Sequence, residues 1–298
     1  MTRRLHIVDV FTERAGAGHA LAVVLGAHGL TSRQMQLLAR EMNYSITSFV
    51  VSAGPEGGAW PVRLYSPSAE LAFAGHPALG TAHVLRQSVF GGASERLCLE
   101  FGDGRVPVVM ERVGRHELYW MAQPRPSFGA RLPRRSLASV LGLAPADLDA
   151  NKPALEVRTG LAHLVVPVRT RQALDRIALD AAAAQALLAP LAARSIVAFA
   201  PGARTAQHQY TVRVFAAASA VAEDPGTGSG NGCLAAWLIE TGAVGDDPLD
   251  VRVEQGARLM RPSTVYLRAM RTSQGIEVRV GGGVADVARG VIVAPMFS

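Results

Sequence analysis

The segment from Glu223 to Gly232 has the densest group of residues suited to binding a ligand, with four glycines and two hydroxyl side chains at the N-terminus of a predicted helix. Glycine lets the backbone approach a ligand closely, and the free N–H groups of a helix N-terminus favour an anion. No lysine follows the glycines, so the segment does not match a nucleotide-binding P-loop. The alternative is an ordinary helix start with Ser229 as its N-cap. The candidate residues here are Asp224, Gly228, Ser229, Gly230 and Asn231.

A second candidate is His76, which lies between Gly75 and Pro77. Histidine is the natural proton carrier near neutral pH. Pro77 suits the first turn of a helix, which places His76 at or next to the N-cap, where the helix dipole would lower its pKa. On spacing alone, a buried histidine with a structural role is the alternative.

A third candidate is His19, which follows the glycine-rich loop Gly16–Gly18 and precedes an apolar run. As a loop residue it is expected to be exposed. Its spacing does not distinguish a chemical role from a plain loop position.

The composition argues against several other classes of protein. A chain of 298 residues that is 49% hydrophobic and has two cysteines is neither a disulfide-stapled miniature nor disordered. The net charge of +6 comes from arginines spread along the chain, so no nucleic-acid partner is expected. No apolar run reaches about 18 residues, so no membrane span or membrane partner is expected. Cys98 and Cys233 form no CxxC motif, which favours a reducing, cytoplasmic setting.

Two successions of strands and helices are expected to position these residues, because apolar β-branched runs alternate with glycine, proline and serine. The first has strands over 5–11, 21–25, 48–52 and 62–65, helices over 32–42 and 76–89, and a hairpin over 97–110. Thr31 or Ser32 can cap the helix over 32–42. The second has strands over 154–157, 164–168, 195–200 and 210–215, helices over 179–191 and 230–240, and hairpin-like segments over 251–293.

The two successions contain similar residues in three places, in the same order. These are 45–50 with 195–200, 62–65 with 212–215, and 75–79 with 230–234. The pattern indicates an internal duplication and two similar lobes, and a small-molecule site is expected in a cleft between them. From Arg63 to His76 is 13 positions and from Arg213 to Asn231 is 18, so an insertion is expected just before the second helix, containing Asp224 and Ser229.

Taken together, these motifs resemble the PhzF-like family of isomerases, which has the diaminopimelate epimerase fold. The resemblance covers nearly the whole chain and rests on 8–12, 21–24, 43–49, 65–70, 75–76 and 223–229. It implies an α+β fold of two pseudo-symmetric lobes, each a curled β-sheet around a central helix. The first lobe would comprise 1–115 with about 283–298, through a returning strand near 289–294. The second would comprise 116–282.

The same resemblance implies an isomerase that needs no cofactor and no metal. Such an enzyme moves a proton and a double bond within a small cyclic carboxylic or amino acid of secondary metabolism, as in phenazine or antibiotic biosynthesis. A cytoplasmic homodimer is expected. Three catalytic positions carry over by motif, His76, Asp224 and Ser229, with His76 facing Asp224 across the cleft. Gly75 and the glycines of the second segment would bind the substrate.

The chain departs from the family pattern at two positions. The pattern Asn-x-Ser-Glu-Thr-x-Phe has its acid/base glutamate where this sequence has Ile46, after Ser45. The usual Gly-Asn-Pro of the first loop is replaced by Gly18, His19 and Ala20. The sequence therefore predicts altered acid/base chemistry, in which His19 replaces the glutamate and Ser45 and Ile46 line the pocket. An inactive carboxylate binder, a structural partner, and an epimerase or cyclase of the same fold are the alternatives. Neither Cys98 nor Cys233 matches the paired cysteines of related epimerases.

Overall fold

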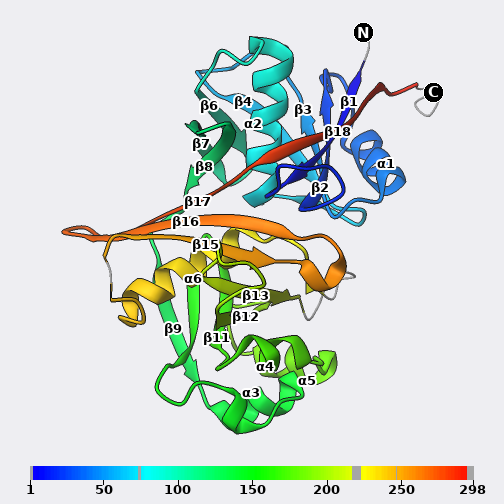
Figure 1. Cartoon of the computed structure of the whole chain (residues 1–298). Helices are drawn as coiled ribbons and strands as arrows, with labels where there is room; N and C mark the ends of the chain where they lie inside the picture. Colours follow the sequence, from blue (N-terminus) through cyan, green and yellow to red (C-terminus); the bar gives the residue numbers. More distant parts are fainter. Residues whose placement is uncertain (1–2, 73–74, 217–222, 246, 294–298) are drawn as a thin grey trace. The chain divides into compact units, whose positions relative to one another are not determined.

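The computed structural model describes residues 3–72, 75–216, 223–245 and 247–293, which form a mixed α/β structure made mostly of strands (Figure 1). The chain divides into two compact units, Met1–Met121 with Gly281–Ser298, and Ala122–Val280. The first boundary falls after Met121 instead of 115, because β8 (His116–Ala122) pairs with β7 (Gly104–Val113). Within the described residues, no helix is both long and apolar enough to cross a membrane.

The first unit packs its strands around the long helix α2 (Gly75–Phe90). Its ladder runs in the order β18 (Val284–Val291), β1 (Arg4–Val10), β2 (His19–Leu25), β3 (Thr47–Val50) and β4 (Trp60–Tyr65). The β2–β3 pair is parallel and the others are antiparallel. β4 also pairs with β5 (Glu70–Leu71) and, in parallel, with β6 (Arg96–Phe101). The predicted return of a late strand to this unit is confirmed, although Ala294 lies outside the described residues.

The second unit repeats this succession around α6 (Gly228–Glu240). Its ladder runs in the order β9 (Ser127–Leu132), β10 (Ala154–Thr159), β11 (Leu161–Pro167), β12 (Ile196–Pro201) and β13 (Tyr210–Phe215). Here β11–β12 is the parallel pair. β13 also pairs with β14 (Glu223–Asp224) and, in parallel, with β15 (Leu249–Gln255). β16 (Ser263–Thr272) pairs with β15, and β17 (Gly275–Gly282) follows. The internal repeat thus appears as the same sequence of strand pairings.

Both central helices are buried on every side over most of their length. In α2 this stretch runs from Gly75 to Arg86, and in α6 from Gly228 to Ile239. Such helices carry apolar or small residues all round. A Cβ on Gly80 would lie 2.5 Å from Leu21 Cδ2, so a larger residue there would require the Leu21 side chain of β2 to shift. The first turn of each helix therefore lies inside its unit.

The remaining helices lie outside the ladders. α1 (Ser32–Met42) has the predicted bounds, and Thr31, not Ser32, caps it in a capping box with Gln34. The predicted helix over 179–191 is wrong in extent, because the chain forms α4 (Arg171–Arg176) and α5 (Ala181–Leu188) instead. α3 (Arg134–Leu141) was not predicted, and it packs with α4 and α5 into a separate apolar cluster. The described residues also form two short 3₁₀ turns, η1 (Pro145–Asp147) and η2 (Ala257–Leu259).

The strand register shows how the two halves of the repeat correspond. Phe49 pairs with Arg63 and Ala198 pairs with Arg213. If the two arginines are equivalent, the predicted match of 45–50 with 195–200 is one residue out. A shift of one residue turns every side chain of a strand to its other face.

The helix starts need a larger correction. Glu70 and Glu223 occupy equivalent ladder positions, opposite Tyr65 and Phe215, and each helix begins five residues later, at Gly75 and Gly228. His76 therefore corresponds to Ser229, not to Asn231. The extra residues of the second unit precede Glu223, so the predicted insertion containing Asp224 and Ser229 is wrong.

Candidate active site

His19 is placed by a tight loop at the start of β2. Gly18 has a φ of +66°, and a Cβ on it would lie 2.3 Å from the Val10 carbonyl oxygen, so only glycine fits this turn. The Gly16 N–H donates to Asp9 Oδ2 at 2.8 Å, which ties the loop back to β1. His19 itself opens β2 and is 5% exposed. The expectation of an exposed loop residue is therefore wrong, because the loop turns this side chain into the unit.

His19 and His76 stack face to face, with ring centroids 3.7 Å apart and an interplanar angle of 17°. His76 is the second residue of α2, with Pro77 in the same first turn, as predicted. His19 Nε2 lies 2.7 Å from Ser45 Oγ. Three residues singled out in the sequence thus meet in the first unit.

Two apolar or small residues border this histidine pair in the chain. Ile46 follows Ser45 and is 7% exposed, and Gly75 precedes His76 at the start of α2. Two imidazolium cations at the distance of the stack would repel each other strongly. At this separation the two rings are therefore unfavourable as a doubly protonated pair.

The N-terminus of α6 presents open backbone donors in the second unit. Thr227 occupies the N-cap position, and its hydroxyl oxygen accepts from Gln255 Nε2 at 3.1 Å. Within the described part of the chain, no acceptor faces the N–H groups of Gly228, Ser229 and Gly230. Ser229 is therefore not the N-cap, and the prediction that it caps the helix is wrong. Three such donors with a helix dipole behind them suit an anion.

The side chain of Gln255 forms hydrogen bonds to the loop before α6 and to the first turn of the helix. Its side-chain oxygen accepts from the Thr227 N–H at 3.2 Å and from Asn231 Nδ2 at 2.7 Å. Its amide nitrogen donates to the Asp224 carbonyl at 2.8 Å. Gln255 and Asn231 are both buried. Asn231, predicted to bind substrate, instead points into its own unit and supports the loop.

The carboxylate of Asp224 is bound to the backbone of the loop that leads into α6. Its Oδ1 accepts from the Gly226 N–H at 3.0 Å, and its backbone pairs with Val214 in the β13–β14 ladder. The loop therefore combines one carboxylate with open N–H donors a few residues later. Such a combination can bind an anion and a proton donor of the same small molecule.

Behind Ser229 lies a histidine that the sequence reading missed. His163 on β11 has Nε2 2.9 Å from Ser229 Oγ and Nδ1 2.5 Å from Ser195 Oγ. Burial lowers the pKa of His163 to about 4, against a smaller opposing effect of the Asp224 charge. The signal available was a lone polar side chain within the apolar run 161–167.

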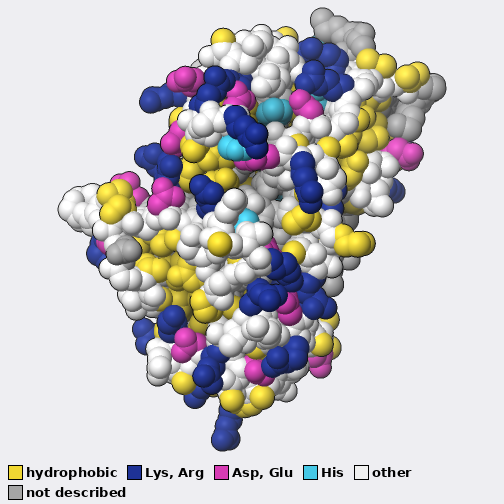
Figure 2. Space-filling view, viewed as in Figure 1, with side chains coloured by type: hydrophobic (Ala, Val, Ile, Leu, Met, Phe, Trp, Pro, Cys, Tyr) yellow, Lys and Arg dark blue, Asp and Glu magenta, His cyan; other side chains and the backbone are white. Residues whose placement is uncertain are grey.

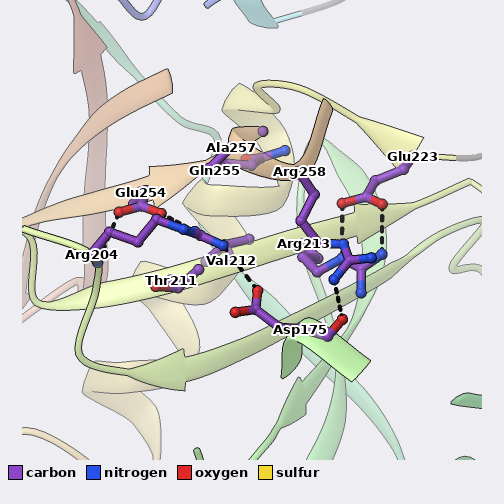
Figure 3. A pocket seen from close by; sticks show the side chains of 11 residues that line it. Asp175, Arg204, Thr211, Val212, Arg213, Glu223, Glu254, Gln255, Ala257 and Arg258 are labelled. Atoms are coloured by element: carbon purple, nitrogen blue, oxygen red, sulfur yellow. Dashed lines mark hydrogen bonds and ion pairs between the residues drawn. The ribbon is translucent and has the colours of Figure 1, made fainter. Parts of the chain in front are cut away.

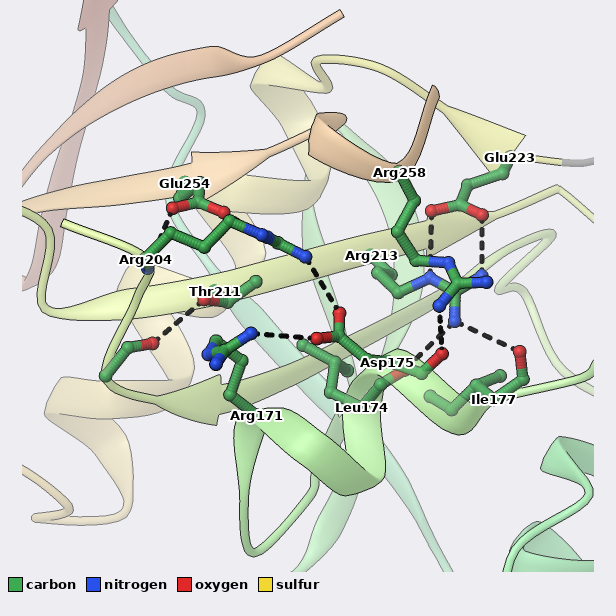
Figure 4. A network of polar contacts seen from close by, with 11 residues as sticks. Arg171, Leu174, Asp175, Ile177, Arg204, Thr211, Arg213, Glu223, Glu254 and Arg258 are labelled. Carbon is green, nitrogen blue, oxygen red and sulfur yellow. Dashed lines mark hydrogen bonds and ion pairs between the residues drawn. The ribbon is translucent and has the colours of Figure 1, made fainter. Parts of the chain in front are cut away.

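The start of the loop is anchored by an ion pair, Arg213 with Glu223 (Figure 4). Arg213 donates from Nε and Nη2 to the two carboxylate oxygens at 2.9 and 2.7 Å, and from Nη1 to the carbonyls of Leu174 and Ile177. The first unit has the equivalent bidentate pair, Arg63 with Glu70. Both units therefore fix the short strand that precedes the central helix by the same device.

A small cavity borders Arg213, lined also by Asp175, Arg204, Glu254 and Arg258 (Figure 3). Arg204 bonds both Glu254 and Asp175, and Arg258 donates to the Asp175 carbonyl. Its volume is about 10 Å³, which is the space of roughly one water molecule. We therefore regard this network as structural.

Other candidate sites lack the required groups. Burial raises the pKa of the Cys233 thiol to about 11, which disfavours the reactive thiolate. In the described ranges, no three His, Cys, Asp or Glu side chains are grouped as metal ligands. On the face shown in Figure 2, basic side chains lie scattered among acidic and uncharged ones.

Comparisons with known proteins place this geometry in context. Residues 8–290 match the family model described as phenazine biosynthesis-like protein. Trans-2,3-dihydro-3-hydroxyanthranilate isomerase of Pseudomonas chlororaphis is 33% identical over 289 residues, covering 96% of this chain and 98% of its own. A predicted epimerase of Pseudomonas aeruginosa has a similar structure, with a TM-score of 0.81, 30% identity, and coverage of 98% and 99%. A PhzF-family protein of Bacillus anthracis shares the fold, with a TM-score of 0.89, 24% identity, and coverage of 99% and 100%.

Proposed function

This chain belongs to the phenazine biosynthesis-like family and is an isomerase, and from that premise we propose that it moves a proton and a double bond within a small cyclic unsaturated carboxylic or amino acid. The reaction would need no cofactor. The proposal includes a departure from the usual acid/base chemistry, because the position of the family glutamate is occupied by Ile46.

The observation that carries the proposal is the stacked pair of His19 and His76. A side chain that transfers a proton must reach the substrate within hydrogen-bond distance and be able to gain and lose a proton near neutral pH. An isoleucine side chain cannot transfer a proton, whereas an imidazole is a chemical group that can. His19 thus supplies a titratable group beside His76 in a chain that lacks the glutamate.

In the proposed reaction, one imidazole takes a proton from a carbon next to the double bond, and the electron pair left behind shifts the double bond by one position. The same imidazolium, or its stacked partner, returns a proton to the far end of the shifted system. The net change is an isomerisation with no gain or loss of atoms. Asp224 and Ser229 are proposed to take part as the family resemblance implies.

The N-terminus of α6 is proposed to bind the substrate carboxylate through the N–H groups of Gly228, Ser229 and Gly230. Charge-assisted hydrogen bonds of this kind hold an anion in a fixed orientation. The curated relative of Pseudomonas chlororaphis is named for an acid of this class, a dihydro-hydroxyanthranilate. We extend to this chain only the class of substrate, a cyclic unsaturated acid.

Incubation of the protein in deuterium oxide with a panel of unsaturated cyclic carboxylates tests the proposal. Mass spectrometry and proton NMR should show deuterium at the new C–H bond of one panel member. His19→Ala and His76→Ala should each abolish this incorporation. If every acid is returned without deuterium although one binds, the chain is a carboxylate-binding protein and the proposal is wrong.

A further inference from the structure

His163 on β11 is buried in the second unit and contacts the Ser229 hydroxyl in the first turn of α6. The His163 ring lies between two serine hydroxyls in a hydrogen-bond relay. Nδ1 is 2.5 Å from Ser195 Oγ, and Nε2 is 2.9 Å from Ser229 Oγ. All three residues are buried. Ser195 is fixed in turn, because its carbonyl accepts from the Leu164 N–H beside β12.

The ring of His163 carries a single proton in its neutral form, so only one of its two nitrogens can donate. Its complete burial and lowered pKa favour this neutral form at pH 7. The two possible tautomers have opposite consequences for the Ser229 hydroxyl.

If Nδ1 carries the proton, the ring donates to Ser195 Oγ, and Ser229 must donate to Nε2. The Ser229 hydrogen is then used in the bond to His163 and cannot be donated to a ligand. The Ser195 hydrogen is left without an acceptor among the described residues. A buried hydroxyl without an acceptor costs about 1–3 kcal/mol.

If Nε2 carries the proton, Ser195 donates to Nδ1 and the ring donates to Ser229 Oγ. The Ser229 hydrogen is then released toward an acceptor at the N-terminus of α6. A bound carboxylate is such an acceptor, so an anion there selects this tautomer. The polar hydrogens of Ser195, His163 and Ser229 then all have acceptors.

We propose that His163 is a positioning residue, which with Ser195 holds the Ser229 hydroxyl as a hydrogen-bond donor to the substrate carboxylate. This rests on the proposed function, because it assigns Ser229 to carboxylate binding. His163 does not itself touch the substrate. Its part is to fix the direction of one hydrogen bond.

The test measures binding of benzoate by calorimetry, with neutral benzamide as the matched ligand that lacks the charge. Ser229→Ala should weaken benzoate binding about tenfold or more, the loss expected for a charge-assisted hydrogen bond. His163→Leu should weaken it by a similar factor and leave benzamide unaffected. His163→Gln, which keeps a donor toward Ser229, should recover most of the loss.

A matched control lies in the same unit. His208 also bridges two hydroxyls, those of Thr205 and Thr264, at 2.6 and 3.0 Å. His208→Leu removes the same chemistry elsewhere and should leave benzoate binding unchanged. Circular dichroism and thermal unfolding verify that each variant is folded.

A double-mutant cycle separates positioning from a merely structural role. In the Ser229→Ala background, His163→Leu should weaken benzoate binding no further, because its effect passes through that hydroxyl. An equal loss in both backgrounds, or no benzoate binding by the unchanged protein, would overturn the inference. If the cycle behaves as expected but no panel acid exchanges deuterium, the positioning role stands and the isomerase reaction proposed above fails.

Discussion

The imidazole rings of His19 and His76 stack at 3.7 Å, one at the start of β2 and the other in the first turn of α2. The pair brings together two histidines that the sequence analysis singled out separately. Ile46, which we propose to stand at the position of the family glutamate, is a buried apolar residue next to Ser45, the hydroxyl that contacts His19. We therefore expect the chemistry of this enzyme to depend on both imidazoles.

Replacing His19 tests this dependence. His19→Asn keeps a side chain that can hydrogen-bond to Ser45 but cannot carry a proton, so kcat should fall by about 10²–10⁴ with little change in KM. Deuterium exchange and steady-state rates on the substrate identified from the panel measure the loss. His116→Ala, at an exposed ion pair with Glu13, is the control and should leave kcat unchanged. Unchanged turnover by His19→Asn would leave His76 as the only imidazole in the reaction.

Restoring the family carboxylate should restore part of the family reaction. Ile46→Glu is expected to give measurable isomerisation of a dihydro-hydroxyanthranilate-type acid, because it adds a proton carrier at the family position. It should also destabilise the protein by roughly 1–3 kcal/mol, since it buries a polar group among apolar neighbours. Ile46→Gln has the same shape and no acidic proton. Equal activity of the two variants would show that the carboxyl group is not the cause.

The loop from Asp224 to Thr227, which leads into α6, is predicted to need the side chain of Gln255 for its stability. Gln255→Met removes the amide that bonds Asp224, Thr227 and Asn231 while keeping the volume. The loss should be roughly 3 kcal/mol of stability, because several buried polar groups lose their partner, and weaker benzoate binding should accompany it. Thermal unfolding and calorimetry measure both effects. Gln274→Met, at an exposed turn, serves as the control, and a similar loss there would refute a local cause.

Acid should destabilise the second unit through His163. The pKa of this ring is lowered from 6.5 to about 4 in the folded chain, so between these values the unfolded chain binds the extra proton. Stability is therefore full above pH 6.5, falls as the pH drops toward 4, and levels off below it. The maximal loss is roughly 3 kcal/mol. The free energy of unfolding, measured between pH 4 and 6.5, should fall less steeply with acid for His163→Gln than for the unchanged protein. An identical pH dependence would show that His163 is not the group responsible.

The two arginine–glutamate pairs should differ in strength despite their equivalent places. The side chains of Arg213 and Glu223 are 9% and 12% exposed, whereas those of Arg63 and Glu70 are 33% and 44% exposed. Arg213→Met leaves a buried carboxylate unpaired and should cost about 3–5 kcal/mol. Arg63→Met should cost less than about 1 kcal/mol, because water screens that pair. Thermal unfolding compares the two, and equal losses would show that burial is not decisive.

Much of this fold could be predicted from local patterns. α1 was predicted to the residue, because its capping box and apolar stripe are both local signals. The stretch from 111 to 153 was not assigned, and it contains β8, β9 and α3. All six residues of β9 are at least partly exposed, so no alternation of buried and exposed positions marks this strand. Its pairing with β10 is a tertiary effect that a local pattern does not carry.

The candidate site was predictable in its residue types but not in its partners. His19 and His76 are separated by more than fifty positions, and only the paired strands and α2 bring their rings together. Likewise, Asn231 looked like a site residue because of its neighbours, yet helical geometry turns it toward Gln255. The motif identifies the segment that contains the candidate residues. The direction of each side chain depends on the residue at which the helix begins, which the motif does not specify.

The pairing of β18 with β1 also has a consequence for synthesis on the ribosome. The second unit is one continuous stretch, Ala122–Val280, so all of its strands exist before β18 has been made. The first unit begins with the earliest strand yet finds the neighbour of that strand in Val284–Val291. The edge of β1 that pairs with β18 therefore stays without its partner until nearly the whole chain has been made.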